Sequence, residues 1–178
     1  TELYFKLCLH EFQQISDRKN LDAPFFVEHV QRINRYFEAL TKSFEIMVDG
    51  MQREQFLKFR LALAPASGFQ SAQYRKIEIY STDFLQLVHK DHREKYTGKE
   101  PIAELFENIY WKEGATDIET GKKTLTLTQF EDRYREEFIQ MGEKLRNDNL
   151  WQCYLRLPAE DQELPEVIHV LKQNDVNV

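Results

Sequence analysis

The feature that most constrains the fold is an apolar stripe that begins at residue 26 and runs to residue 47. Large apolar residues recur there at helical spacing, at Phe26, Val30, Ile33, Phe37, Leu40, Phe44 and Met47. Intervals of three and four residues place such side chains on one face of an α-helix. The preceding Asp22-Ala23-Pro24 is typical of a helix start. We therefore predict a long amphipathic helix that buries one face against other parts of the chain.

The same helical periodicity continues through most of the chain. Only 6 glycines and 5 prolines occur in 178 residues, which favours long helices over a fold with many turns. Residues 1–15 are apolar nearly all round and predict a helix that is buried on most sides, in a core or in a subunit interface. Further helices are predicted after Pro101, from a capping box at Thr128 and Glu131, and from Pro165.

One segment, from Gly114 to Thr128, departs from this periodicity. It holds two glycines and a Thr-Leu-Thr-Leu-Thr alternation, so we predict a loop or a short hairpin there. The fold class predicted for the chain is therefore all-α, a bundle of long amphipathic helices. No repeat or linker divides the sequence, which favours a single helical domain over residues 1–178.

Charge and composition limit the classes of partner. The formal net charge is -6, which argues against nucleic acid or an anionic membrane as the main partner. No apolar run approaches the roughly 18–20 residues of a membrane span, and no signal peptide is visible. The two cysteines, Cys8 and Cys153, fit a reducing compartment better than a disulfide framework. We expect a cytoplasmic protein.

The candidate site is a corner between two predicted helices. Phe56, Arg60 and Leu63 follow one another at i, i+4 and i+7, which places them on one helix face. Pro65 ends that helix near Leu63, since the residue before a proline is pushed out of the helical region. Ser67 then opens a second helix, with Gln70 three residues later as in a capping box. The corner thus brings together a guanidinium, an aromatic ring and a hydroxyl, a set that suits a small aromatic carboxylate.

Structural roles are also open to the residues of the first corner helix. Arg60 is equally suited to a helix ion pair with Glu54, or with Glu78 across the corner. Phe56 is of a type found more often in a core than against a ligand. Spacing alone therefore leaves ligand binding and structural pairing both open.

The second corner helix carries the same ambiguity. Ser67 is suited to a helix N-cap, and that role is compatible with a contact to a ligand. Gly68 permits either the close approach of a flat cofactor to the backbone or simply the turn. We interpret Tyr74 and Arg75 as packing and surface charge.

A resemblance bears on this choice. Phe56, Phe59, Arg60, the run from Pro65 to Ser71, and Gln73, Arg75 and Glu78 together resemble the signature of the tryptophan 2,3-dioxygenase family. At the N-terminus, Glu2-Leu3-Tyr4-Phe5-Lys6 and Leu9-His10-Glu11 are similar to a helix of the same family. These segments cover roughly the first half of the chain. The second half is similar only in its helical pattern.

The resemblance implies an activity and a set of roles. Members of the family use haem b and dioxygen to open the indole ring of L-tryptophan, inserting both oxygen atoms across the C2–C3 bond to give N-formylkynurenine. By this resemblance Arg60 would bind the substrate carboxylate, while Phe56 and Leu63 would shape the slot for the indole. Ser67 and Gly68 would lie at the edge of the haem. A homotetramer, assembled as a dimer of dimers, is implied as well.

The family's two haem-facing histidines have no counterpart in this sequence. By the register of the match, the distal histidine would precede Thr1, and nothing from Ala159 to Val178 resembles the proximal one. His169 is isolated, and we assign no iron ligand. We expect the chain to be part of a longer catalytic domain. Two other hypotheses stay open: a helical relative without haem that binds an aromatic amino acid, and a purely structural helical protein.

Overall fold

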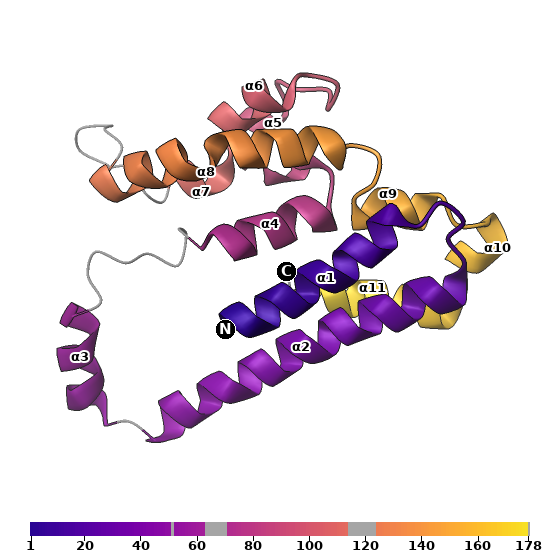
Figure 1. Ribbon diagram of the computed structural model, residues 1–178. Helices are drawn as coiled ribbons and strands as arrows, with labels where there is room; N and C mark the ends of the chain where they lie inside the picture. The colour runs from indigo at the N-terminus through magenta and orange to yellow at the C-terminus, as the bar shows by residue number, and fades with distance from the viewer. Residues whose placement is uncertain (51, 63–70, 114–123, 178) are drawn as a thin grey trace.

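The computed structural model describes residues 1–178 apart from residues 51, 63–70, 114–123 and 178, and it is helical throughout the described part (Figure 1). The helices are α1 (Glu2–Asp17), α2 (Ala23–Gly50), α3 (Arg53–Ala62), α4 (Ala72–Ser81), η2 (Phe84–Leu87), α5 (Lys90–Arg93), α6 (Ile102–Glu107), α7 (Tyr110–Glu113), α8 (Leu125–Lys144), α9 (Leu150–Leu155), α10 (Ala159–Gln162) and α11 (Pro165–Asn177). The described residues form no strand, only an isolated bridge between Val88 and Ile109. The prediction of an all-α fold is confirmed.

The first core forms where α1 and α11 pack on the first two-thirds of α2 (Figure 1). The predicted stripe of α2 lies in it as far as Leu40, and α1 contributes one face. The buried apolar residues of these three helices are Phe5, Cys8, Phe12, Ile15, Ala23, Phe26, Val30, Ile33, Phe37, Leu40, Val167 and Val170. The opposite face of α1 is open, and Leu3 is 70% exposed. Within this chain α1 is therefore buried on one face, and burial of its open face in a subunit interface stays a prediction.

A second core lies between η2, α6, α7 and α8. Its centre is aromatic: the Trp111 indole meets the rings of Phe106 and Phe130 edge-on, with centroids 5.6 Å apart in both pairs. Helix α4 joins the two cores, because Ile77 packs in the first and Ile79 in the second. The chain immediately after the predicted corner is thus fixed between both cores.

Helix α8 begins one turn earlier than predicted. Thr124 is its N-cap, and the Thr124 hydroxyl accepts a hydrogen bond from the Leu127 backbone N–H at 3.3 Å. The helix therefore starts at Leu125, before the predicted capping box at Thr128. Residues 124–128 are consequently not a hairpin, because burying Leu127 completely favours helical over strand spacing. The rest of the predicted hairpin lies outside the described residues.

The start of α4 also differs from the prediction. The helix begins at Ala72, and the Ser71 hydroxyl accepts a hydrogen bond from the Tyr74 backbone N–H at 3.3 Å. The N-cap of α4 is therefore Ser71, whereas the sequence predicted a helix from Gly68 capped by Ser67. The predicted capping box of Ser67 and Gln70 lies outside the described residues.

Beyond Leu40 the far end of α2 leaves the core. Phe44 continues the apolar stripe but is 49% exposed, and α3 stands apart from the other helices at that end (Figure 1). None of the described helices is long and apolar enough to cross a membrane. The cysteines Cys8 and Cys153 are free, and burial raises the pKa of the Cys8 thiol to about 12 and that of Cys153 to about 11.

Gly142 allows α8 to pack closely on the second core. A Cβ atom at this position would lie 2.8 Å from Ile102 Cγ2 and 2.9 Å from Phe84 Cδ2. We predict that Gly142→Ala lowers the free energy of unfolding by about 1–3 kcal/mol, because the added methyl overfills the core. Urea unfolding measures this loss. Gly50→Ala is the matched control, since a Cβ there meets nothing within 4 Å, and it should leave stability unchanged or slightly raised. Equal effects at the two glycines would contradict the prediction.

Candidate functional site

The structure describes only part of the predicted corner. Phe56 lies on α3 and is 45% exposed, and residue 60 lies one turn later on the same helix. The side chain of Arg60, together with Leu63, Ser67 and Gly68, lies outside the described residues. The site predicted from these residues therefore stays a prediction.

A buried polar network follows the corner on α4. Arg75 Nη1 donates hydrogen bonds to Glu78 Oε2 and to the Tyr110 hydroxyl oxygen, both at 2.6 Å. The Tyr110 hydroxyl in turn donates to Glu78 Oε1. Arg75 and Glu78 are 4% and 5% exposed. We call these three side chains the Arg75 network. They hold α4 against α7, because each of them hydrogen-bonds to buried polar groups of the other two.

Aromatic rings surround the Arg75 guanidinium. Its central carbon lies 5.0 Å from the ring centroid of Tyr74, 5.6 Å from that of Tyr110 and 5.9 Å from that of Trp111. Burial raises the pKa of the Glu78 carboxyl, although Arg75 and Tyr110 act to lower it. Burial, with the Glu78 carboxylate beside it, raises the pKa of Tyr110 to about 12. Because both side chains are buried, each charge of the Arg75–Glu78 pair is stabilised by the other and would be costly to bury alone.

These contacts correct one interpretation of the sequence. The prediction that Arg75 carries surface charge is wrong, because its side chain is buried and ion-paired. Both Glu78 oxygens accept hydrogen bonds, from Arg75 and from Tyr110. The pairing of Glu78 with Arg60 stays a prediction, because the Arg60 side chain lies outside the described residues. The sequence signals of this pair were the i, i+3 spacing of Arg75 and Glu78 and their place in the family signature.

The histidines do not assemble a metal site. The described residues contain no group of three or more His, Cys, Asp or Glu side chains placed to hold a metal ion. His29 is buried, and its Nδ1 lies 2.6 Å from Glu11 Oε2 in the first core. His10 and His169 are not buried, and His89 and His92 lie partly exposed near α5.

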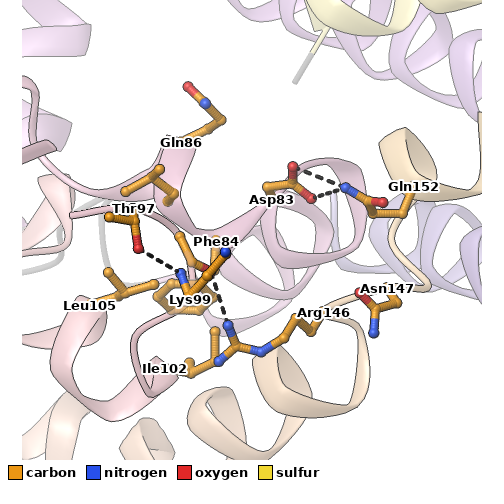
Figure 2. A pocket seen from close by; sticks show the side chains of 12 residues that line it. Asp83, Phe84, Gln86, Thr97, Lys99, Ile102, Leu105, Arg146, Asn147 and Gln152 are labelled. Atoms are coloured by element: carbon orange, nitrogen blue, oxygen red, sulfur yellow. Dashed lines mark hydrogen bonds between the residues drawn. The ribbon is translucent and has the colours of Figure 1, made fainter. Parts of the chain in front are cut away.

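A cavity of about 640 Å³ opens between η2, α6 and the end of α8 (Figure 2). Phe84 and Ile102 line its apolar side, and the Asp83 carboxylate accepts hydrogen bonds from the Gln152 side chain at 2.9 and 3.1 Å. Arg146 donates to the backbone carbonyls of Gly98 and Glu100, at 3.0 and 2.8 Å. Asp83 and Arg146 are thus already engaged with protein partners, and the exposed Lys99 is a further charged residue of the lining.

A second cavity of about 510 Å³ lies where the end of α4 and η2 meet α9 and α11. We call it the Trp151 cavity, after the indole on its wall. Among the residues that the structure describes, no histidine lines either cavity. The described residues therefore do not fit a haem site.

Comparison with known proteins places the chain in a family. A family model described as tryptophan 2,3-dioxygenase matches residues 1–154, most of the chain. The chain belongs to the tryptophan 2,3-dioxygenase family. The match includes the predicted corner and the Arg75 network, and it leaves out α10 and α11.

Curated relatives agree with the family model over a shorter stretch. A tryptophan 2,3-dioxygenase of Alteromonas mediterranea is 39% identical over 84 residues, which are 44% of this chain and 23% of that protein. One from Ruegeria sp. is 39% identical over 80 residues, 44% of this chain and 28% of that protein. One from Nocardioides sp. is 34% identical, over 45% of this chain and 32% of that protein. The chain thus spans about a quarter to a third of the length of these relatives. No solved structure matches it.

Proposed function

We propose that this chain belongs to an enzyme that oxidises L-tryptophan with dioxygen to N-formylkynurenine. The observation that carries the proposal is the family-model match over residues 1–154, which includes the corner from Phe56 to Gly68. The curated relatives are named for this reaction. Because the aligned residues make up only part of those relatives, we assign to this chain the part of the reaction that its own residues can perform.

That part is recognition of the substrate. Arg60 binds the carboxylate of L-tryptophan through two parallel N–H donors, since a planar guanidinium matches a carboxylate. Phe56 and Leu63 enclose the indole, and Ser67 and Gly68 approach the cofactor edge. The exposed Phe56 ring supports this assignment, because it is available to a ligand.

Haem b is the cofactor that the family implies, and it would supply the oxygen chemistry when bound. No histidine lines either of the two cavities described above, so no step is assigned through the iron in this chain. We propose that haem binding requires residues beyond these 178. A homotetramer is proposed likewise, and the open apolar side chains of Leu3 and Phe44 support self-association. We propose a cytoplasmic location without a nucleic-acid or membrane partner, supported by the net charge of -6.

The second candidate function is binding of an aromatic amino acid without haem. Both candidates use Arg60 for the carboxylate, so they differ only in the cofactor.

Haem titration separates the two candidates. We predict that the 178-residue chain gives no stable Soret band on addition of ferric haem, while calorimetry still detects L-tryptophan binding. The natural protein at its full length should give both. A histidine-ligated haem complex of the 178-residue chain would contradict this prediction, and His169→Ala would then show whether that histidine is the ligand. Absence of tryptophan binding by both forms would rule out the proposed function.

A further inference from the structure

The Trp151 cavity has no role in the proposed reaction. Its walls come from the last turn of α4, from η2, from the start of α9 and from the last turns of α11. Helix α11 lies beyond residue 154, where the family match ends. The family resemblance therefore does not account for this cavity. Its volume of about 510 Å³ falls within the roughly 300–1,000 Å³ of ordinary small-molecule sites.

One side of the cavity is apolar, while Glu78, Ser81, Thr82 and Gln86 add polar groups to its lining. Leu87 and Leu150 are buried beneath it, and Leu171 of α11 is half-buried at its side. The Trp151 indole is 43% exposed and lies beside the Tyr154 ring, with centroids 5.2 Å apart. A flat or branched apolar group can therefore pack on leucine side chains and on an indole at once.

Polar groups of α11 line the same cavity. Asn174 is 4% exposed, and its Nδ2 makes only a long hydrogen bond to Asn34 Oδ1, at 3.4 Å. Lys172 and Asp175 are exposed residues of the lining, three positions apart on the helix. Neither is ion-paired to any residue that the structure describes. The mouth of the cavity thus offers one ammonium and one carboxylate that the described protein groups do not neutralise.

We propose that the Trp151 cavity binds an α-amino acid with an aromatic or branched apolar side chain. The ligand side chain packs on Leu87, Leu150 and Trp151. Its carboxylate meets Lys172 and its ammonium meets Asp175. A zwitterion fits better than a single ion, because a simple acid would be repelled by Asp175 and a simple amine by Lys172. This site is separate from the predicted corner and does not depend on Arg60.

Three compounds that share a phenylethyl group but differ in their charges test whether the ligand needs both an ammonium and a carboxylate. L-phenylalanine carries both charges, 3-phenylpropanoate only the carboxylate and phenethylamine only the ammonium. The reporter is intrinsic tryptophan fluorescence, because Trp151 is exposed while Trp111 is buried, and Trp151→Phe identifies its share of the signal. We expect saturable binding of L-phenylalanine with a dissociation constant at least about tenfold lower than that of either analogue, because each analogue lacks one of the two paired charges. Absence of saturation, or an analogue that binds as tightly, would overturn the proposal.

Substitutions then locate the ligand. Lys172→Gln and Asp175→Asn should each weaken L-phenylalanine binding by about tenfold and bring it close to that of one analogue. The matched controls Lys19→Gln and Asp49→Asn, at exposed positions outside the cavity, should leave it unchanged. Arg60→Leu should also leave it unchanged. If Arg60→Leu abolishes binding while the α11 variants do not, the ligand occupies the corner and the Trp151 site is refuted. Failure of tryptophan binding at the corner would not alter these results, so the two proposals fail independently.

Discussion

Replacing Arg60 by leucine is expected to abolish tryptophan recognition while the protein stays folded. The substitution removes a charge-assisted pair that, in a desolvated site, is worth on the order of 2–5 kcal/mol, or roughly a thirtyfold to several-thousandfold loss of affinity. Lysine should recover only part of it, because an ammonium is a point charge without the planar fork. Calorimetric titration with L-tryptophan measures the loss. In the natural protein at its full length, haem content should stay normal while turnover falls.

The control for Arg60→Leu lies on the same helix. Arg53 is the first residue of α3 and is exposed, so Arg53→Leu makes the same chemical change without touching the predicted carboxylate site. It should leave tryptophan affinity unchanged. Indole, which has no carboxylate, should bind the Arg60→Leu variant as well as the parent. If Arg60→Leu instead lowers the melting temperature and keeps tryptophan affinity, Arg60 is a structural ion-pair residue and the carboxylate role is refuted.

The helices could be predicted because burial on one face leaves a period in the sequence. Val30, Ile33 and Phe37 show this period, and all three are buried where α2 meets its neighbours. Pro165 likewise predicts the start of α11, since a proline suits the first turn of a helix. Patterns of this kind depend only on local spacing, so they can be recognised in the sequence without knowledge of the tertiary structure.

The start of α8 could not be predicted from local spacing. Thr124 and Thr128 are both suitable caps, and only Thr128 has a glutamate three residues later. In the structure Thr124 is the cap and Leu127, in the first turn, is completely buried in the second core. The short alternation of threonine and leucine is compatible with a strand and with a first helical turn, so the sequence alone favoured the wrong element.

The candidate site also has a part that the sequence could predict and a part that it could not. The family resemblance supplied a role for Arg60, whereas spacing alone left an ion pair equally open. The burial of Arg75 could not be predicted, because its partner Tyr110 lies 35 residues away in sequence. The Trp151 cavity is built from α4, η2, α9 and α11, and no local spacing records that these elements meet.

The Arg75 network gives the largest stability effect that we expect from a single substitution. Arg75→Leu leaves the Glu78 carboxylate buried without a cation, and we predict a loss of about 3–5 kcal/mol in the free energy of unfolding. For a chain of this size that corresponds to a fall in melting temperature of roughly 2–4 °C per kcal/mol. Tyr110→Phe should cost less, about 1.5–3 kcal/mol, because it removes hydrogen bonds to charged groups but no charge. Thermal and urea unfolding of both variants measure these losses.

The next residue on α4 supplies the control for this prediction. Lys76 forms an exposed ion pair with Glu137, so Lys76→Met removes a cation from the same helix at a cost of about 0–1 kcal/mol. Replacing both charges of the network, as Arg75→Met with Glu78→Leu, should recover much of the loss, since neither charge is then left buried alone. Additive losses in the double variant would mean that the two side chains do not depend on each other. If Arg75→Leu costs no more than Lys76→Met, the network does not fix α4 between the two cores, and the residues that follow the corner are held by apolar packing alone.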